Sequence, residues 1–336
     1  MTIKDLSAIT GYAVGTVSRA LNNHPNVSEK ARASILKAAE EYGFELNVNA
    51  KQLKQQHFNT ILVVTKGIGN ELFSELIETI QHLVSKTRYQ LVVDYMDENA
   101  NEVIRAVQLC REKKPMGVLF LGGNKVHFAR DFDKIDVPCV LVTNDASDLQ
   151  FDNLSSVCTD DAEAAHSAIQ TLIALGHRKI AIIGGDRSVS DTSRLRYEGC
   201  CRAFQEYGIA FDDSRDYRGV RFSCADGYRA TKELLAGGGD YTAIFAVADV
   251  MAMGAIRALW EAGKRVPEDI SVMGVDGLPL GTYLIPQLST ISQSIRRMAM
   301  RGVEILLDAM EKNAPACHEK VPFEIQKRES IRKIGE

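Results

Sequence analysis

The residues with the most specific chemistry near the start of the chain lie in the segment from Val14 to Asn22. Arg19 stands out there, because an arginine guanidinium can donate two parallel hydrogen bonds to O6 and N7 of guanine. A phosphate contact or a solvated charge is the alternative role for Arg19. The segment also carries hydroxyl and amide side chains, which suit phosphate contacts that fix the position of a helix on DNA. They are Thr16, Ser18 and Asn22.

Three short helices would hold this segment in place. Thr2 and Asp5 have the spacing of a capping box at the start of a first helix, and Gly11 gives the backbone freedom that a tight turn needs. Ser28 is placed to cap a third helix, which ends near Gly43. The apolar residues available to pack the helices are Leu6, Ile9, Val17, Leu21 and Ile35. The pattern is typical of a helix-turn-helix, whose second helix enters the major groove, although any small three-helix module could share it.

The bulk composition is that of an ordinary globular protein. The chain has 336 residues, enough for two or three domains, and is 45% hydrophobic and 25% charged. Its net charge of −4 argues against a general binder of polyanions. Residues 1–57 carry seven Lys or Arg and five Asp or Glu residues, so the remainder has a net charge of −6. A mildly basic segment on an acidic body suits a DNA-contacting module.

The sequence gives no sign of a membrane span, a metal or a cofactor. The first residues show no charged-then-apolar leader, and no apolar run approaches the ~18 residues of a membrane span. The seven cysteines are scattered without a Cys-x-x-Cys pair, and the seven histidines lack ligand spacing. Glycine-rich stretches at 67–69, 184–185 and 237–239 lack the full spacing of nucleotide-binding loops. The acidic pairs at 160–161 and 212–213 have no accompanying nucleophile, which favours helix capping. We therefore expect a cytoplasmic protein with reduced thiols and no cofactor.

From residue 58 onward, short apolar runs alternate with segments of helical periodicity. The runs that predict strands lie at 60–64, 90–94, 117–121, 139–142, 179–183, 243–246 and 271–275. Fully apolar strands between amphipathic helices predict parallel sheets that are covered on both faces. The strands fall into two series, which predicts two doubly wound lobes with a ligand cleft at the carboxyl ends of the strands. A further helix at 294–310 and a strand near 323–326 indicate that the chain crosses between the lobes more than once.

Specific stretches along almost the whole chain carry a resemblance to a known family. They lie at 2–6, 16–22, 27–28, 47–53, 175–181, 196–199, 249–255, 267–272 and 288–291. Together they resemble the lactose-repressor/galactose-repressor (LacI/GalR) family of bacterial transcription regulators. The resemblance implies an N-terminal DNA-binding head, a hinge helix, and a two-lobed effector core shaped like a periplasmic sugar-binding protein. It also implies a homodimer and a chain that crosses between the lobes three times.

The fold class that follows is α/β, with a helix-turn-helix domain and a two-lobed, doubly wound, periplasmic-binding-protein-like core. We expect the helix-turn-helix domain at 1–46 and the hinge helix or linker at 47–57. The N-terminal lobe of the core would comprise 58–159 plus 291–321, and the C-terminal lobe 160–290 plus 322–336.

In the head, Val14 and Gly15 align with the two main specificity positions of the family. Val14 can contact a thymine methyl group, whereas Gly15 has no side chain to read a base and costs ~1 kcal/mol of helix stability relative to Ala. Ala13 departs from the capping serine that the family usually has there. We therefore expect this segment to bind DNA, but these residues do not specify the operator sequence.

In the hinge, Leu53 aligns with the leucine that the family inserts into the minor groove at the operator centre, where apolar wedges kink the duplex. A buried linker residue is the alternative. Asn49 and Ala50 are expected to contact DNA beside it. Leu46 replaces the family's proline, and Lys51 replaces an arginine and so loses its planar fork. Because so short a helix is unstable alone in water, we expect residues 47–55 to become helical on DNA.

In the core, Arg196 and Asp276 align with the family's effector arginine and effector acid. Arginine suits carboxylate, phosphate or paired hydroxyl groups, and aspartate accepts from hydroxyls or an amine. An inter-lobe ion pair is the alternative for both residues. Phe222 aligns with an aromatic residue that commonly stacks on the ligand, and a core position is its alternative. The other expected effector contacts are Asn70, Phe73 and Asp249. Ala248 and Thr143 replace the Asn and Asp of sugar-binding relatives.

We therefore expect a dimeric, sequence-specific transcriptional regulator of the repressor type that is not an enzyme. It would bind a pseudo-palindromic double-stranded DNA operator and a small effector of sugar-like chemistry between the core lobes. A solute-binding module of a transporter is one alternative, and the DNA-binding head argues against it. An enzyme on a doubly wound fold is another, but the sequence shows no catalytic constellation.

Overall fold

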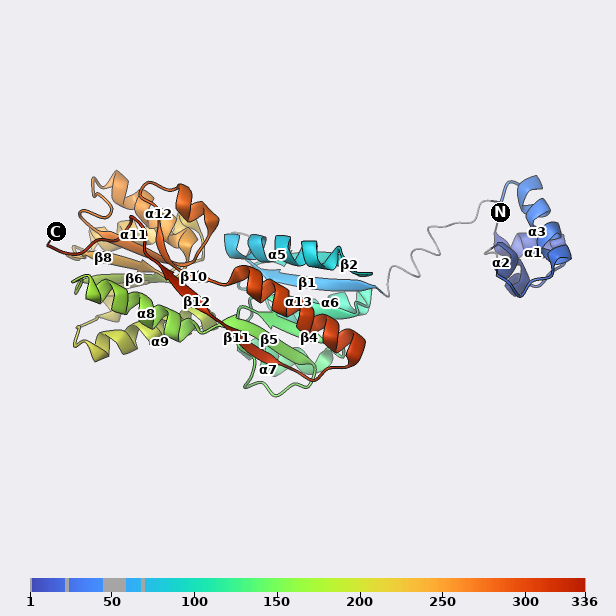
Figure 1. Cartoon of the computed structure of the whole chain (residues 1–336), viewed down its shortest axis with the longest axis horizontal. Helices are drawn as coiled ribbons and strands as arrows, with labels where there is room; N and C mark the ends of the chain where they lie inside the picture. Colours follow the sequence, from blue (N-terminus) through green and yellow to red (C-terminus); the bar gives the residue numbers. More distant parts are fainter. Residues whose placement is uncertain (1, 22–23, 45–58, 68–69, 336) are drawn as a thin grey trace. The chain divides into compact units, whose positions relative to one another are not determined.

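The computed structural model describes residues 2–21, 24–44, 59–67 and 70–335, and the chain forms two compact units, Met1–His57 and Phe58–Glu336 (Figure 1). Among the described residues, the first unit contains three α-helices and the second contains two six-stranded sheets. The hinge expected at 47–57 lies outside the described residues. None of the helices described is both long and apolar enough to cross a membrane.

The helices of the first unit begin and end where their capping residues place them. These helices are α1 (Ile3–Thr10), α2 (Val14–Leu21) and α3 (Glu29–Glu41). The N–H of Asp5 donates to the Thr2 hydroxyl while the N–H of Thr2 donates to the Asp5 carboxylate, so the predicted capping box is confirmed. Gly11 ends α1 with φ 72°, in the left-handed region. The Ser28 hydroxyl accepts from the N–H of Ala31 and caps α3, as predicted.

A small apolar cluster holds these three helices together. Leu6, Val17 and Ile35 are fully buried and Leu21 is partly buried, as expected. Ile9 is 45% exposed, so the prediction that it packs between the helices was wrong. The remaining buried positions belong to small side chains instead, Ala20, Ala31, Ala38 and Ala39, because the short helices have little room for large ones.

The first sheet of the second unit, sheet A, is entirely parallel in the order β11-β5-β4-β3-β1-β2. Its strands are β1 (Thr60–Lys66), β2 (Gln90–Met96), β3 (Gly117–Leu121), β4 (Cys139–Val142), β5 (Leu154–Thr159) and β11 (His318–Val321). The helices beside it are α5 (Glu71–Val84), α6 (Glu102–Lys113), α7 (Lys125–Asp131), the 3₁₀ turn η1 (Phe132–Lys134) and α13 (Ile295–Lys312). We call this part of the unit lobe A.

Both faces of sheet A are covered, because alternate residues of each strand join different apolar clusters. Ile61 and Val63 of β1 pack with the cluster that includes α5 and α13, and Leu62 and Val64 pack with the cluster that includes α6 and α7. Figure 1 shows α5 and α13 on one side of the sheet and α6 on the other. The apolar runs of β1, β3 and β4 are therefore confirmed as strands buried on both faces, whereas β2, at the edge of the sheet, is only partly buried.

The second sheet, sheet B, has the order β12-β10-β9-β8-β6-β7, and β12 is antiparallel to β10. Its strands are β6 (Ile180–Gly184), β7 (Tyr217–Gly219), β8 (Ala243–Ala246), β9 (Ser271–Asp276), β10 (Ser289–Gln293) and β12 (Phe323–Gln326). Its helices are α8 (Asp161–Ala174), α9 (Asp191–Glu206), α10 (Asp213–Asp216), α11 (Cys224–Ala236), α12 (Asp249–Glu261) and the 3₁₀ turn η2 (Pro279–Tyr283). We call this part lobe B.

Glycine allows the helices α11 and α12 of lobe B to pack closely. A Cβ atom on Gly254 would lie 2.0 Å from the carbonyl oxygen of Cys224, and one on Gly227 would lie 2.3 Å from that of Met251. Such distances are far below van der Waals contact, so neither position accepts a larger residue without moving a backbone.

The chain passes between the two lobes at three places, as the family resemblance implied. These are the connections β5–α8, β10–α13 and β11–β12. The second connection follows Gln293, so all of β10 belongs to sheet B and the expected lobe boundary at 290/291 falls inside this strand. The sequence patterns missed four strands, β5, β7, β10 and β11, which are short or carry polar residues.

The start of α2 offers a stability test in the first unit. The Ala13 carbonyl accepts from the N–H groups of Thr16 and Val17, so Ala13 stands where a capping side chain would act. We predict that Ala13→Ser stabilises this unit by about 0.5–2 kcal/mol, since a serine hydroxyl there satisfies a free helix N–H. Thermal unfolding followed by circular dichroism measures the effect. Ala13→Val, which adds a side chain without an acceptor, is the control, and an equal gain from it would contradict the capping explanation.

Candidate functional site

The second helix of the first unit has one packed and one exposed face. Its buried residues are Val17 and Ala20. The residues of this helix that we expect to contact DNA are exposed or partly exposed: Val14, Gly15, Thr16, Ser18 and Arg19. A Cβ atom on Gly15 would meet no atom within 4 Å, so the surface beside it is open. The other expected contacts, Asn22, Asn49, Ala50 and Leu53, lie outside the described residues.

The second unit contains a cleft of about 370 Å³ between lobe A and lobe B. The carboxyl ends of parallel strands from both sheets form it, because these ends meet at the facing edges of the two lobes. Lobe A contributes Lys66 at the end of β1, Glu98 after β2, Gly122 after β3 and Thr143 after β4. Lobe B contributes Gly185 after β6 and Asp276 at the end of β9. The cleft predicted at the carboxyl ends of the strands is therefore present in the structure.

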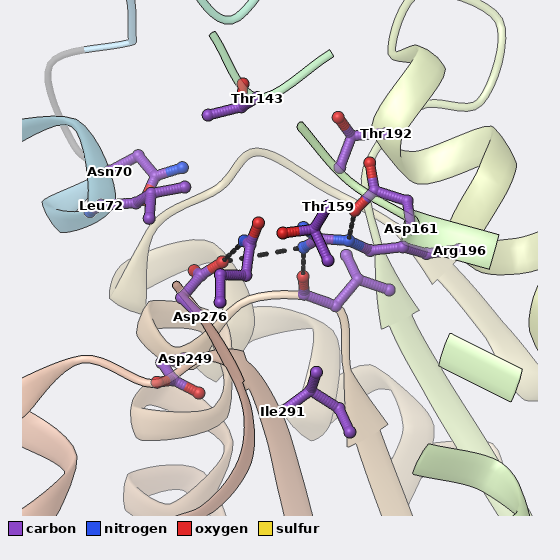
Figure 2. A network of polar contacts seen from close by, with 12 residues as sticks. Asn70, Leu72, Thr143, Thr159, Asp161, Thr192, Arg196, Asp249, Asp276 and Ile291 are labelled. Carbon is purple, nitrogen blue, oxygen red and sulfur yellow. Dashed lines mark hydrogen bonds and ion pairs between the residues drawn. The ribbon is translucent and has the colours of Figure 1, made fainter. Parts of the chain in front are cut away.

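A buried arginine organises the lobe B wall of this cleft. Arg196 lies on α9 and is 3% exposed. Its Nε donates to the Asp161 carboxylate over 2.8 Å, and its Nη1 donates to the carbonyl oxygen of Val247. The same Nη1 lies 3.8 Å from the Asp276 carboxylate. Figure 2 shows Arg196 between Asp161 and Asp276, with their polar contacts as dashed lines.

The alternative role for Arg196 and Asp276 is an ion pair that joins the two lobes. The two side chains do form an ion pair, but both belong to lobe B, so the pair does not bridge the lobes. Asp276 also lines the cleft, as does Arg196. The structure therefore brings both residues together at the cleft wall.

The Asp276 carboxylate has one satisfied and one unsatisfied oxygen. Its Oδ1 accepts a hydrogen bond of 2.7 Å from Nε2 of Gln293. Its Oδ2 is buried and has no hydrogen-bond partner among the described residues. The backbone of Asp276 has φ 127°, which is rare for a residue with a side chain and is held only where the surroundings enforce it. Burial raises the pKa of Asp276 and the Arg196 charge opposes this rise.

Two further carboxylates are buried beside this pair. Burial raises the pKa of Asp161, against the attraction of Arg196. Burial also raises the pKa of Asp249, and the neighbouring charge of Asp276 adds to the rise. Three carboxylates thus surround one guanidinium, and burial favours the protonated form of each.

The structure places Asp249 outside the cleft, contrary to its expected role as an effector contact. Asp249 is fully buried, and its carboxylate accepts from the N–H of Leu278 over 2.8 Å and from the Thr290 hydroxyl over 2.7 Å. It therefore joins the start of α12 to the loop after β9 and to β10. The sequence predicted Asp249 as an effector contact, and only the fold shows that its carboxylate is engaged with Leu278 and Thr290 instead.

The other expected effector residues line the cleft. They are Asn70, Phe73, Arg196, Phe222 and Asp276. The Asn70 side-chain oxygen also caps α5 by accepting from the N–H of Leu72. Of the two departures from sugar-binding relatives, Thr143 lines the cleft and Ala248 is completely buried.

Sequence reasoning missed a buried ion pair at the cleft wall of lobe A. Lys66 donates to the Glu102 carboxylate over 2.8 Å, and Glu102 is fully buried. Nδ1 of His127 lies 2.9 Å from the same carboxylate oxygen. The only signal in the sequence was the position of Lys66 at the end of a predicted strand, and its partner is 36 residues away.

Hydrogen bonds between the lobes border the cleft. On one side, Arg221 of lobe B donates to Asp97 over 2.6 Å and to Glu98 over 2.7 Å. Elsewhere, the Asn124 amide donates to the Val189 carbonyl oxygen over 3.0 Å. The Lys125 N–H donates to Asp191, and the Asn144 amide donates to Thr192. These contacts hold the two lobes together around the cleft. Within the described residues, no cluster of His, Cys, Asp or Glu has the arrangement of a metal site.

Two family models match the chain. The model of bacterial regulatory proteins of the lacI family matches residues 2–47, and the model of the periplasmic binding protein-like domain matches residues 152–331. The HTH-type transcriptional regulator MalR of Clostridium butyricum is 33% identical over 98% of this chain and 99% of its own length.

Solved structures match over the whole chain or its core. The Lac repressor dimer bound to operator and the anti-inducer ONPF is 27% identical with a TM-score of 0.74, and the match covers 99% of both chains. A LacI family transcriptional regulator from Enterococcus faecium with bound ribose is 26% identical with a TM-score of 0.70, and this match covers 82% of the present chain and 99% of that one.

The buried arginine can be tested by its contribution to stability. We predict that Arg196→Ala lowers the free energy of unfolding by about 3–5 kcal/mol, because it leaves buried carboxylates without their cation. Arg194→Ala is the matched control on the same helix. Arg194 is 42% exposed and pairs with Asp191 and Glu198, so its loss should cost less than about 1 kcal/mol. Urea unfolding of the full chain measures both, and equal effects would contradict the structural role of Arg196.

Proposed function

The chain belongs to the lacI family of bacterial regulatory proteins and so is a DNA-binding transcriptional regulator. On this basis, we propose a separate role for each of its two units. The protein acts as a homodimeric repressor in the cytoplasm. The first unit binds a pseudo-palindromic operator, and the cleft of the second unit binds a sugar-type effector. The observation that carries this proposal is the joint position of Arg196 and Asp276 on a cleft, in a chain that begins with a helix-turn-helix.

The DNA contacts that we propose come from the exposed face of α2. Arg19 reads a base, Val14 contacts a base methyl group, and Thr16 and Ser18 contact phosphates. We propose a phosphate contact for Asn22 as well, which follows this helix in the sequence. Gly15 allows the helix and the DNA to approach each other closely but does not read a base. In the segment after the head, Asn49 and Ala50 contact DNA and Leu53 inserts into the minor groove at the operator centre.

The effector contacts that we propose are Asn70, Phe73, Arg196, Phe222 and Asp276. Asp249 is not among them, since its carboxylate is engaged behind the cleft wall. A sugar-type effector is supported by the solved LacI family regulator with bound ribose, which shares 26% identity with this chain. The cleft supports it as well, because aromatic rings and polar side chains line the same space.

The position of the Arg196 network suggests how binding in the cleft changes the relation of the lobes. Asp161 starts α8, directly after the first connection between lobes, and Gln293 ends β10, directly before the second. Arg196 binds Asp161, and Gln293 binds Asp276. A ligand that binds Asp276 is therefore linked to the second connection by one hydrogen bond, through Gln293. It is linked to the first connection by two polar contacts, through Arg196 and Asp161. We propose that a change in lobe closure there alters how the paired heads meet the operator.

The relatives also bear on the two alternatives to a regulator. MalR is named as a transcriptional regulator and matches this chain from end to end, which supports a regulatory role over an enzyme or a transporter component. The described cleft residues, moreover, do not form a nucleophile–base pair of the kind that catalysis needs. We do not propose a second function.

The base-reading role of Arg19 gives the test of DNA recognition. A random-sequence pool selected with the wild-type protein first supplies the operator. We predict that Arg19→Ala weakens operator binding by about 1–3 kcal/mol and leaves binding to random DNA nearly unchanged, since only the operator offers the bidentate contact. Fluorescence anisotropy at two salt concentrations measures both affinities.

Lys37→Ala is the matched control, because it removes one positive charge from the exposed surface of α3. Equal losses of Arg19→Ala on operator and random DNA would show that Arg19 contacts only phosphate. Failure of the wild-type protein to enrich any sequence from the pool would contradict the proposed function itself.

A further inference from the structure

Glu102 of lobe A is a fully buried carboxylate at the start of α6. Its Oε2 accepts from Nζ of Lys66 over 2.8 Å and lies 2.9 Å from Nδ1 of His127. Its Oε1 accepts from the backbone N–H of Asn124 over 2.5 Å. A buried charge is costly unless close partners compensate for it. The carboxylate and its three partners are therefore held in fixed relative positions.

The three partners of Glu102 belong to separate parts of lobe A. Lys66 ends β1 and lines the cleft. Asn124 caps α7, because its side-chain oxygen accepts from the N–H of Val126 over 2.9 Å. His127 lies in the first turn of α7. One carboxylate thus fixes the end of a cleft strand relative to the start of α7.

The start of α7 is also a place where lobe A contacts lobe B. The Asn124 side-chain amide donates to the carbonyl oxygen of Val189 over 3.0 Å, and the N–H of Lys125 donates to the Asp191 carboxylate over 2.9 Å. Both acceptors belong to the segment 189–192 of lobe B, three of whose residues line the cleft. The backbone that Glu102 holds is therefore the backbone that meets lobe B.

The loop that leads to Asn124 needs such an anchor. It consists of Gly122 and Gly123, and Gly122 has φ 75°, in the left-handed region. Two successive glycines give a backbone little stiffness of its own. The loop passes close to the carboxylate, since a Cβ atom on Gly123 would lie 3.5 Å from Oε1 of Glu102. The hydrogen bond from the Asn124 N–H to Glu102 is therefore what fixes the end of this loop.

We propose that Glu102 is a positioning residue for the contact between the lobes. By holding the N–H of Asn124, it sets the start of α7 against the segment 189–192 and so determines how the lobes close. Glu102 is not among the residues that line the cleft, and each of its hydrogen-bond partners described above belongs to lobe A. The inference rests on the proposed function in one respect, namely that lobe closure controls the heads.

Two double variants separate this role from the burial of a charge. Lys66→Met with Glu102→Gln removes both charges but keeps an oxygen that can accept from the N–H of Asn124. Lys66→Met with Glu102→Met removes both charges and this acceptor. Because neither variant leaves one member of the buried ion pair without its partner, both should fold. Asn124→Ala removes the contact with Val189 directly.

Hydrogen exchange of the full chain, measured by mass spectrometry without DNA or ligand, gives the readout. The N–H groups of Ser188, Val189, Ser190 and Ser193 bond within lobe B, so their exchange reports the order of this segment. We expect exchange at 188–193 to become about three- to tenfold faster in the Glu102→Met double variant and in Asn124→Ala, because each loses a contact that holds the segment.

The controls should change exchange at 188–193 by less than about twofold. They are the Glu102→Gln double variant, which keeps the acceptor, and Glu112→Gln, which removes an exposed negative charge from the same helix. Exchange in β3 and β4 should also change by less than about twofold in every variant, since the interior of lobe A stays folded. A role limited to the stability of lobe A would instead speed exchange in these strands.

Unchanged exchange at 188–193 in the Glu102→Met double variant would overturn the inference. An equal increase in the Glu102→Gln double variant, or equal loss of protection in β3 and β4, would overturn it as well. Should the Glu102→Met double variant not fold, Asn124→Ala decides: unchanged exchange at 188–193 would show that this contact does not hold the segment. Selection of an operator from the random pool tests the proposed function separately, and a protein that selects one keeps that function whatever the exchange shows.

Discussion

The buried guanidinium of Arg196 is the interaction on which the core depends most. It ties α9 to the start of α8, to the carbonyl oxygen that follows β8, and to the carboxylate that ends β9. A charge buried this deeply is stable only when its partners are close and well oriented. The three elements that it binds are therefore fixed relative to each other, and the lobe B wall of the cleft follows from that arrangement. The network also leaves one oxygen of Asp276 buried without a hydrogen-bond partner among the described residues.

The same network lies where the chain passes between lobes. Asp161 follows the first connection and Gln293 precedes the second, so ligand contacts at Asp276 are close to both. The remaining contacts between lobes lie around the cleft, from Arg221 on one side to Asn124 on another. Because these contacts are polar and several are exposed, each one alone adds little to stability. A ligand in the cleft can therefore shift the equilibrium between open and closed lobes.

Local sequence patterns predicted those parts of the fold that depend on contacts between residues close in the sequence. The Thr2 capping box, the left-handed Gly11 and the Ser28 cap are all contacts within a few residues, and all three occur as expected. Strands buried on both faces were evident from their apolar runs. Long-range contacts were not accessible in this way. The Lys66–Glu102 pair, the engagement of Asp249 behind the cleft, and the end of β10 at Gln293 all depend on which strands become neighbours. Family resemblance supplied Arg196 and Asp276, and only the structure shows that one oxygen of the Asp276 carboxylate has no hydrogen-bond partner among the described residues.

The most direct measurement is the dissociation constant for the selected operator, with and without a saturating concentration of a sugar that raises the thermal midpoint of the protein. If the cleft controls the head, the sugar should change operator affinity by at least fivefold. Thermodynamic linkage requires that the operator change the affinity for the sugar by the same factor and in the same direction. Operator affinity that stays the same with the cleft saturated would contradict control of the head by the cleft.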